Sequence, residues 1–460
     1  MNLIELKGKG YKIVTNWQEC NKKSIFLFNS NNNTKFIDYK NLAFKKQCRF
    51  IICNIKLKKI CKHNFIKYYY YKNQKDLDKI ANIFFELNNL KIIFVTGTNG
   101  KTSIAYGANK LFSINGFRSC YIGTLGFFIN SKKIKKLNNT TPSYFEILNL
   151  LQIAKNKNIN YVFIEISSIG YCEGRIGNLT YNYCILTNLK SDHLDYHKNI
   201  KNYHSAKLNL IKKNKTKNSI LFLQDDKLKN KFNNFNQIIT QSTFLYKNKI
   251  SIVQKKLGKF QISTKNRSYQ IDSFNDYMIK NIITILMLYD KLFKLLPLKI
   301  NKSIFPPGRS EIVYNKKNKI IIIDYAHSKD AYENLLCKLP LFKKNIIIIY
   351  GCGGDRDKIK RPQIARVVSK YTNLQIITDD NPRNEDPASI RNEIATYCKK
   401  SINVDGRKKA ISKAISIMKK NDILLIAGKG HEKTQEIKGK VSLFDDEIVA
   451  KEYFDKRFSL

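Results

Sequence analysis

From residue 91 onward, short apolar runs alternate with polar or glycine-bearing loops. The runs lie at 91–95, 161–166, 183–187, 320–324, 346–350, 374–378 and 423–427. Runs that are apolar at nearly every position are typical of parallel strands covered on both faces. Ligands of open α/β sheets bind beyond the carboxyl ends of the strands, so we expect the chemistry in the loops that follow. The pattern predicts two consecutive doubly wound α/β domains.

Two adjacent prolines and a glycine at 306–308 mark the predicted boundary between these domains. Paired prolines cannot continue a helix, and a new apolar run follows soon afterwards. We therefore assign residues 88–304 to a central domain and residues 305–460 to a Rossmann-like C-terminal domain. Residues 1–87 have a weaker pattern, which includes a tyrosine run at 68–71, and we assign them to a small N-terminal α/β domain.

The stretch 94–103, Phe-Val-Thr-Gly-Thr-Asn-Gly-Lys-Thr-Ser, places a glycine-bearing turn between an apolar run and the start of a helix. Backbone N–H groups of such a turn point at a phosphate, Lys101 adds a positive charge, and the Thr102 hydroxyl can ligate Mg²⁺. The most common P-loop would have glycine at position 95, where this chain has Val95, so the loop at 97–102 is a tighter variant. The stretch predicts a central P-loop domain that binds a nucleoside triphosphate.

Composition favours a soluble globular protein. The chain has 460 residues, of which 43% are hydrophobic and 26% charged. It has no apolar run long enough to span a bilayer, and its first residues lack a secretory core. The ten cysteines are scattered without a paired spacing, as expected of reduced thiols, and zinc is not expected. We predict a cytoplasmic protein with no membrane partner.

The net charge of +47 raises the question of a nucleic-acid partner. Lysine far outnumbers arginine and is spread along the chain beside abundant Asn and Ile, as codon bias in an AT-rich genome would produce. Specific nucleic-acid readers rely more on arginine for bidentate base contacts. We therefore expect no specific nucleic-acid partner, and a basic nucleic-acid-binding ATPase is kept as an alternative.

The loops at the ends of the apolar runs form a recognisable set. They lie at 97–102, 139–142, 165–168, 191–197, 203–207, 307–311, 324–327, 351–361, 380–383 and 428–432. In sequence and in order they resemble the ATP-dependent Mur ligases of peptidoglycan synthesis, from about residue 90 to the C-terminus. The resemblance implies three domains, which bind a UDP-linked substrate, ATP and an amino acid in chain order. It also implies a monomer.

The family resemblance implies that ATP phosphorylates the D-Glu side-chain carboxylate of UDP-MurNAc-L-Ala-D-Glu, and that an amine then attacks the acyl phosphate. Phosphoryl transfer needs charge neutralisation and positioning more than covalent help from the protein. The residues that match the ATP site are Gly97, Thr98, Asn99, Gly100, Lys101, Thr102, Ser103, Arg309, Asp324 and His327.

A metal-binding set also follows from the resemblance. Glu165 and His193 are suited to Mg²⁺ together with Thr102. Lys207 matches a family lysine that CO₂ carbamylates, which turns a cation into a carboxylate-like metal ligand and requires a neutral amine. The resemblance thus assigns the catalytic roles to Lys101, Lys207, His193 and Glu165, with Mg²⁺ and a carbamate on Lys207 as cofactors.

The muramoyl-peptide contacts implied by the resemblance are Asn139, Thr140, Thr141, Ser167, Glu173 and Arg175. Hydroxyls and an amide suit a polar peptide, and Arg175 can hold a carboxylate with two hydrogen bonds. Two positions depart from the family pattern. Ile169 stands where the family usually has histidine, and Glu173 stands where it has glutamine.

The last two loops imply which amino acid is added. Meso-diaminopimelate differs from lysine by a carboxylate on its distal carbon, and Arg383 supplies a planar cation to read that carboxylate. Glu432 is placed to pair with the distal ammonium. The residues that match this pocket are Arg356, Asp380, Asn381, Pro382, Arg383, Gly428 and Glu432.

The N-terminal domain matches the family least. The family's Asp-Ser-Arg uridine motif is replaced by Asn16-Trp17-Gln18, so we assign no uridine contact. Because of Trp17 and Ile169, a decayed and inactive relative remains an alternative. A folylpolyglutamate synthetase is another, although it would not be expected to carry the loops at 380–383 and 428–432.

Overall fold

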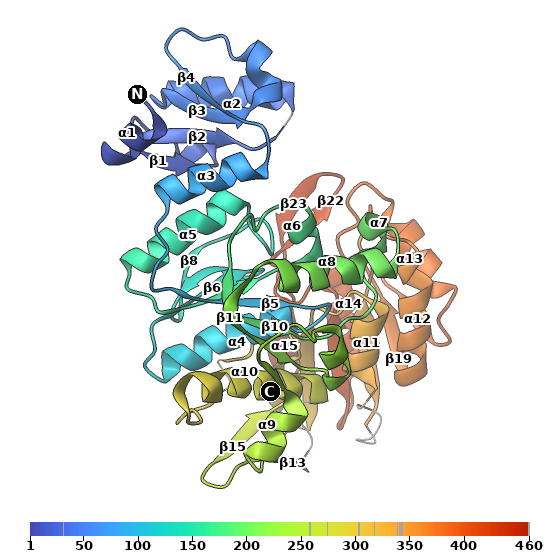
Figure 1. Ribbon diagram of the computed structural model, residues 1–460. Coiled ribbons are helices and arrows are strands. Elements are labelled where there is room, and N and C mark those ends of the chain that lie inside the picture. The colour runs from blue at the N-terminus through green and yellow to red at the C-terminus, as the bar shows by residue number, and fades with distance from the viewer. Residues whose placement is uncertain are drawn as a thin grey trace.

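The computed structural model describes residues 1–30, 32–256, 259–273, 275–301, 304–316, 318–337, 339 and 344–458. Figure 1 shows a small N-terminal α/β unit at the top, a larger central unit below it, and a C-terminal unit beside the central one. Each unit has its own mainly parallel sheet. The predicted fold class, an α/β protein of three domains, is confirmed.

A parallel sheet with strand order β1-β2-β3-β4 forms the N-terminal unit. The tyrosine run becomes strand β4, in keeping with the preference of aromatic side chains for strands. The strands are β1 (Lys12–Val14), β2 (Ser24–Phe28), β3 (Phe50–Asn54) and β4 (Lys67–Tyr71). The helices are α1 (Leu3–Gly8), η1 (Trp17–Glu19), α2 (Asn33–Lys45), η2 (Ile55–Ile60) and α3 (Gln74–Phe84).

An eight-stranded sheet with order β12-β11-β10-β5-β9-β6-β7-β8 forms the central unit. The strands are β5 (Lys91–Thr96), β6 (Ser119–Gly123), β7 (Gly126–Ile129), β8 (Lys132–Lys135), β9 (Tyr161–Glu165), β10 (Tyr181–Leu186), β11 (Lys215–Leu223) and β12 (Ile238–Thr240). All pairs from β12 to β6 are parallel, and β7 and β8 add an antiparallel edge.

The helices of the central unit explain why its parallel strands are apolar on both faces. Ile93 and Val95 of β5 pack into one buried cluster, while Ile92 and Phe94 pack into another. The helices are α4 (Lys101–Ile114), α5 (Tyr144–Asn156), α6 (Ser168–Cys172), α7 (Leu194–His197), α8 (Ile200–Lys213), η3 (Asp226–Lys231), α9 (Gln241–Lys247) and α10 (Asp276–Phe293).

A separate antiparallel sheet follows the central sheet, in a region where the sequence gives only weak strand signals. Its strands are β13 (Ser251–Lys256), β14 (Lys259–Ser263) and β15 (Ser268–Asp272). Phe260 and Ile262 of β14 join the buried cluster that contains α10 residues such as Ile282. The sheet therefore packs through one face only, which explains its alternating and less hydrophobic sequence.

The C-terminal unit has a six-stranded sheet with order β16-β17-β21-β18-β19-β20, in which β16 alone is antiparallel. The strands are β16 (Glu311–Lys316), β17 (Lys319–Asp324), β18 (Ile346–Tyr350), β19 (Leu374–Ile377), β20 (Ser401–Asn403), β21 (Ile423–Ala427), β22 (Thr434–Ile437) and β23 (Lys440–Leu443), the last two forming a hairpin. The helices are α11 (Lys329–Leu336), α12 (Lys360–Tyr371), α13 (Pro387–Ala395), α14 (Arg407–Ile417) and α15 (Asp446–Phe458).

Among the described residues, no helix is long and apolar enough to cross a bilayer. All ten cysteines are free thiols, as their spacing predicts.

A fully buried ion pair ties α14 to α15 in the C-terminal unit. The Arg407 guanidinium donates from Nε to Asp446 Oδ1 at 2.7 Å and from Nη2 to Asp446 Oδ2 at 2.8 Å. Both side chains are completely buried. Arg407 Nη2 also donates to the Ala427 carbonyl oxygen at the end of β21, so the pair links both helices to the sheet.

Because Asp446→Ala leaves a buried guanidinium without its carboxylate, we expect it to destabilise the C-terminal unit by about 3–5 kcal/mol. Urea-dependent hydrogen exchange of β21 measures this loss. The control is Glu452→Ala, which removes exposed pairs with Lys456 on α15 and Lys408 on α14 and should leave the exchange profile almost unchanged, because exposed pairs contribute little. A loss for Asp446→Ala no larger than that of the control would contradict the structural role of the pair.

Candidate functional site

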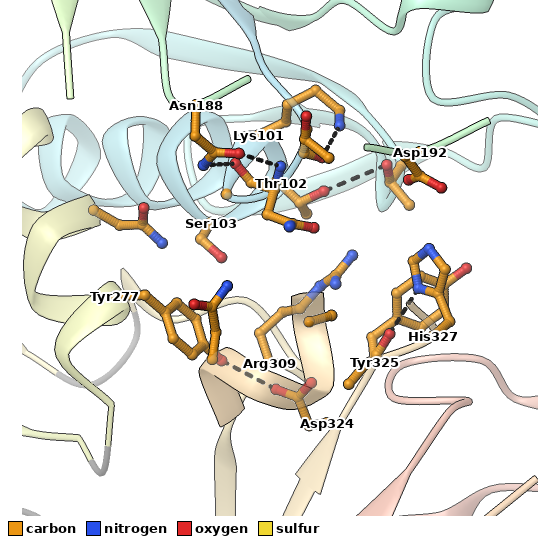
Figure 2. Close-up of a pocket in the computed structure, with 18 of the residues that line it drawn as sticks. Lys101, Thr102, Ser103, Asn188, Asp192, Tyr277, Arg309, Asp324, Tyr325 and His327 are labelled. Carbon is orange, nitrogen blue, oxygen red and sulfur yellow. Dashed lines mark hydrogen bonds between the residues drawn. The ribbon is translucent and has the colours of Figure 1, made fainter. Parts of the chain in front are cut away.

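A cavity of about 250 Å³ lies between the central and C-terminal units. Figure 2 shows Lys101, Thr102 and Asn188 on one side, facing Arg309 and Tyr325 on the other. Its remaining lining includes Thr98, Asn99, Gly100, Ser103, Thr124, Thr140, Ser167, Asp192, His193, Gln224, Tyr277, Asn281, Asp324 and His327. The P-loop and the seam residues predicted from sequence thus line the same cavity.

The loop between β5 and α4 owes its shape to two glycines. Gly100 precedes α4 with a φ of 89°, and Gly97 has a φ of 141°. A Cβ on Gly97 would lie 1.9 Å from Thr187 Oγ1, so no side chain fits there. Thr187 Oγ1 donates to the Asn99 carbonyl oxygen at 2.6 Å, and Asn188 Oδ1 accepts from the Asn99 N–H at 3.1 Å. The end of β10 therefore fixes the P-loop.

Two lysines from different helices converge on the Gly97 carbonyl oxygen. Lys101 Nζ donates to it at 3.0 Å, and Lys207 Nζ of α8 donates to it at 2.9 Å. Lys207 is only 1% exposed. Burial, followed by the nearby charge of Lys101, lowers the pKa of Lys207 well below its usual range. Burial also lowers the pKa of Lys101, against the opposing attraction of Glu165.

Glu165, at the end of β9, is the most heavily bonded acid of the site. Its Oε2 accepts from Thr102 Oγ1 at 2.8 Å and from Thr124 Oγ1 at 3.2 Å, and its Oε1 accepts from the Thr124 N–H at 3.1 Å and from the Tyr121 hydroxyl. The side chain is fully buried. The carboxylate is thus held beside the Thr102 hydroxyl, as the predicted metal set requires.

His193 and its neighbour Asp192 line the cavity beside a residue of the C-terminal unit. Lys360 Nζ of α12 donates to Asp192 Oδ1 at 2.9 Å. Burial opposes ionisation of Asp192, but the charge of His193 when its ring is protonated and the charge of Lys360 outweigh it and hold the pKa of this carboxyl below its usual range. Partial desolvation lowers the pKa of His193, which therefore favours a neutral ring. His193 adopts a left-handed backbone with φ of 51°.

Among the described residues, no group of three or more His, Cys, Asp and Glu side chains could hold a metal ion. Mg²⁺ is usually held by one or two carboxylates together with substrate phosphates and water, so a cage made only of protein is not required. The oxygens of Thr102 and Glu165 fit such a partial site.

Of the residues matched to the muramoyl peptide, Thr140 and Ser167 line the cavity, and Thr141 and Arg175 bond behind them. Thr141 Oγ1 donates to the Glu165 carbonyl oxygen at 3.0 Å and accepts from the Ser167 N–H at 2.9 Å. Arg175 Nη1 donates to the Thr141 carbonyl oxygen at 2.9 Å, and Arg175 also pairs with Glu173. Thr140 Oγ1 lies 3.0 Å from Thr124 Oγ1, and Asn139 is exposed.

The residues matched to the amino-acid pocket come from three strand-end loops. Asn381 Nδ2 donates to Glu432 Oε2 at 2.9 Å, and Arg383 Nη1 donates to the Gly354 carbonyl oxygen at 2.7 Å. A Cβ on Gly428 would lie 2.5 Å from Asp380 Oδ2, so glycine is needed for the loops to meet.

Strand β22 supports the loop at 380–383 from behind. The Arg383 N–H donates to the Glu436 carbonyl oxygen at 3.1 Å, and Gln435 Nε2 donates to the Asp380 carbonyl oxygen at 2.6 Å. Pro382 lies in this supported loop, and Arg356 is exposed.

At the seam between the two units, the Asp324 carboxylate accepts hydrogen bonds from two neighbours. Asp324 Oδ2 accepts from the Ser310 N–H at 2.6 Å and from the Tyr277 hydroxyl at 3.3 Å. Burial raises the pKa of Asp324, although Arg309 opposes this shift.

His327 Nδ1 lies 2.9 Å from the Tyr325 carbonyl oxygen, which can only accept, so this nitrogen carries the proton.

Sequence reasoning missed several residues of the cavity, among them Thr124, Asn188, Tyr277, Asn281 and Tyr325. Tyr277 and Asn281 lie four positions apart on α10, which is otherwise largely apolar, and this spacing is a signal that could have identified them. Thr124 follows β6 without a distinguishing pattern, so only the fold places it against Glu165.

A second hollow, of about 520 Å³, lies between the N-terminal and central units. Trp17 and Tyr39 form part of its wall with ring centroids 6.4 Å apart, and Lys135 and Lys136 of the central unit lie on the other side. Asn138 also lines this hollow, while Thr140 lines the first cavity. A single short segment therefore connects the two.

Comparisons with known proteins agree with this geometry. Residues 95–287 match the model of the Mur ligase middle domain, and residues 308–430 match that of the Mur ligase glutamate ligase domain. A relative named UDP-N-acetylmuramoyl-L-alanyl-D-glutamate–2,6-diaminopimelate ligase, from Wigglesworthia glossinidia brevipalpis, is 33% identical over 98% of this chain and 94% of its own. The protein of the same name from Buchnera aphidicola subsp. Baizongia pistaciae is 36% identical over 87% of this chain and 83% of its own.

Solved structures show the same fold. A structure of UDP-N-acetylmuramoyl-L-alanyl-D-glutamate–2,6-diaminopimelate ligase has a TM-score of 0.58 at 24% identity, covering 97% of this chain and 95% of its own. The MurF ligase from Thermotoga maritima in complex with ADP has a TM-score of 0.66 at 16% identity, covering 100% of this chain and 99% of its own. A Mycobacterium tuberculosis folylpolyglutamate synthase has a TM-score of 0.57 at 14% identity, covering 77% of this chain and 91% of its own. At this identity the likeness shows the fold alone. The family models and the nearly full-length relatives together establish that this chain belongs to the Mur ligase family.

Proposed function

We propose that this protein is an ATP-dependent, ADP-forming ligase that joins meso-2,6-diaminopimelate to UDP-MurNAc-L-Ala-D-Glu in the cytoplasmic stage of peptidoglycan synthesis. The observation that carries the proposal is the shared cavity, where the P-loop of the central unit faces the seam residues of the C-terminal unit. The relatives that carry the name of this activity support the choice of substrates. Family membership argues against the alternative of a nucleic-acid-binding ATPase.

The proposed reaction has two steps. An oxygen of the D-Glu side-chain carboxylate attacks the γ-phosphorus of ATP, and ADP leaves with the bridging oxygen. The free amine of diaminopimelate then attacks the carbonyl carbon of the acyl phosphate, phosphate leaves, and the nitrogen loses a proton as the amide forms. Lys101 and the P-loop N–H groups hold the phosphates during the first step. Thr140 and Arg175 hold the peptide carboxylate in line, and the buried Thr141, whose carbonyl oxygen accepts from Arg175 Nη1, supports them.

Thr102 and Glu165 would hold Mg²⁺, because both present hard oxygens at the P-loop end of the cavity. When bound, the ion would neutralise negative charge on the phosphate oxygens. His193 lies on the same wall, and the lowered pKa of its ring leaves it neutral and able to ligate.

Lys207 supports the carbamate proposal through its burial. Only a neutral amine attacks CO₂, and the pKa of Lys207 is lowered well below its usual range. In that attack the nitrogen forms a bond to carbon and loses a proton, which leaves an anionic carbamate. The carbamate would place a negative charge beside the positive charge of Lys101, which is a favourable pairing.

The amine pocket supports diaminopimelate over lysine. The distal carbon of diaminopimelate carries both an ammonium and a carboxylate. Arg383 and Glu432 offer one cation and one anion, and Asn381 Nδ2 holds the Glu432 carboxylate at 2.9 Å. With lysine bound, Arg383 would keep only Glu436, whose Oε2 lies 3.7 Å from Arg383 Nε. It would lack the second anion that the distal carboxylate of diaminopimelate supplies, which costs binding free energy in a partly buried site.

The hollow at Trp17 supports binding of the uridine diphosphate end. Aromatic rings such as Trp17 and Tyr39 stack on a base, and Lys136 suits a diphosphate. Lys135 pairs with Glu19 at 2.8 Å and would have to exchange that partner to join Lys136. The connecting segment between Asn138 and Thr140 allows one extended substrate to reach both cavities.

The first test is amino-acid choice. Phosphate release with ATP, UDP-MurNAc-L-Ala-D-Glu and meso-diaminopimelate should exceed that with L-lysine by at least about 100-fold in kcat/KM, because lysine lacks the distal carboxylate that Arg383 would bind. Arg383→Ala should narrow this ratio, while Arg366→Ala, an exposed arginine of the same unit, should not. Equal turnover of both amino acids by the wild type would contradict the role of Arg383. No turnover with either would contradict the proposed function.

Lys207→Ala tests the carbamate. We expect nearly complete loss of ligation with ATP binding retained, since Lys207 acts on the reacting groups and not on nucleotide affinity. Lys212→Ala, at the exposed end of the same helix, is the matched control and should keep full activity. The wild type incubated with labelled bicarbonate should show a carbamate carbon signal by NMR that Lys207→Ala lacks. Wild-type turnover by the variant would rule out this role.

Trp17→Ala tests the uridine end. Loss of one stacking side chain should raise KM for the UDP-linked substrate by about 10-fold, while KM for ATP stays unchanged. Trp17→Phe should restore most of the affinity. Phe65→Ala removes an exposed aromatic of the same unit, 72% exposed, and should have no effect. Equal KM values for the UDP-linked substrate in Trp17→Ala and the wild type would show that the base binds elsewhere.

A further inference from the structure

Tyr325 lies where the nucleotide side and the amine side of the site meet. It follows strand β17 directly and lines the shared cavity (Figure 2). The roles proposed above belong to its neighbours Asp324 and His327, and none belongs to Tyr325 itself. The side chain nevertheless contacts charged groups at both ends.

The ring of Tyr325 supports Arg309. The Arg309 guanidinium carbon lies 4.3 Å from the ring centroid, within the range of a cation–π contact. Arg309 Nε is buried without a hydrogen-bond partner, so the ring face is the support that the structure gives to this part of the guanidinium. Arg309 lies at the cavity wall and faces the P-loop side chains (Figure 2).

The hydroxyl of Tyr325 reaches the amine pocket. It donates to Glu432 Oε1 at 3.3 Å, while Asn381 Nδ2 donates to Glu432 Oε2 at 2.9 Å. The buried Lys429 Nζ also lies 3.5 Å from Glu432 Oε2. Oε2 thus has two neighbouring donors, while the Tyr325 hydroxyl donates to Oε1. Burial, and then the charge of Glu432, raise the pKa of Tyr325 to about 12, so the hydroxyl keeps its proton and remains a donor.

The backbone around Tyr325 leaves the ring little freedom. A Cβ on Gly430 would lie 2.6 Å from the Tyr325 Cβ, so the loop after β21 packs directly against the residue. The rings of His431 and His327 lie 5.0 Å and 4.9 Å from the Tyr325 ring. Neighbours from two loops therefore fix the ring between Arg309 and Glu432.

We propose that Tyr325 is a positioning residue that couples the nucleotide site to the amine site. Its ring holds Arg309 toward the triphosphate, and its hydroxyl sets the orientation of Glu432 for the distal ammonium of the incoming amino acid. This inference rests on the proposed function, because Glu432 has this role only if the amine pocket receives diaminopimelate. One side chain then orients both the group that faces ATP and the group that receives the nucleophile.

Two substitutions separate the two contacts. Tyr325→Phe keeps the ring under Arg309 but removes the hydroxyl, so KM for meso-diaminopimelate should rise about 10-fold with KM for ATP within about 2-fold of wild type. Tyr325→Leu removes both contacts and should also raise KM for ATP, by about 5-fold. Tyr314→Phe is the matched control, because it removes a tyrosine hydroxyl bonded to a carboxylate, Asp455, in the same unit but outside the cavity.

A merely structural role would lower kcat or thermal stability without this split between the two KM values. The proposal is overturned if Tyr325→Phe leaves KM for diaminopimelate at the wild-type value, or if it changes both KM values equally. The affinity for a fluorescent ATP analogue, measured without amino acid, tests the Arg309 contact independently. Tyr325→Phe should bind the analogue as tightly as the wild type does, and Tyr325→Leu should bind it more weakly. If both variants bind the analogue with equal affinity, the proposed support of Arg309 by the Tyr325 ring is overturned. A wild type that turns over no diaminopimelate overturns the proposed function instead.

Discussion

The site depends on the absence of a side chain at Gly97. A Cβ there would lie 1.9 Å from Thr187 Oγ1, so only glycine lets the P-loop rest on the end of β10. The same contact leaves the Gly97 carbonyl oxygen open to Lys101 and Lys207, which both donate to it. Two buried lysine nitrogens are thereby given an acceptor, and a buried polar group without a partner would be costly. One backbone position thus organises the lysines on which the proposed chemistry relies.

The parallel sheet brings together residues that are far apart in the chain. Strand β5 lies between β9 and β10, so Thr96, Glu165 and Leu186 end at the same edge. The C-terminal unit completes the site from the opposite side, where Lys360 donates to Asp192 at 2.9 Å across the seam. The cavity is therefore a property of two units together, which suits a reaction whose phosphoryl donor and amine bind in different domains.

Charge acts in two distinct ways in this protein. The net charge of +47 comes from lysines spread along the whole chain. The charges of the cavity are few and buried, and their neighbours shift their pKa values, as for Lys207 and Asp192. Electrostatic interactions are stronger in such a desolvated setting than at the surface. The arrangement inside the cavity, and not the overall charge, therefore bears on function.

The sequence by itself determined the fold class, the order of the strands that carry loops, the P-loop and the family, because continuous apolar runs and glycine-bearing turns are local patterns. Even the weakly patterned N-terminal part of the chain forms a small α/β unit, as the fold class predicted. Only the tertiary structure decided which side chains meet. Thr124 reaches Glu165, and Tyr325 reaches both Arg309 and Glu432, through contacts between segments distant in the chain. Such contacts leave no periodic signal, since they depend on how sheets and domains pack and not on spacing along the sequence.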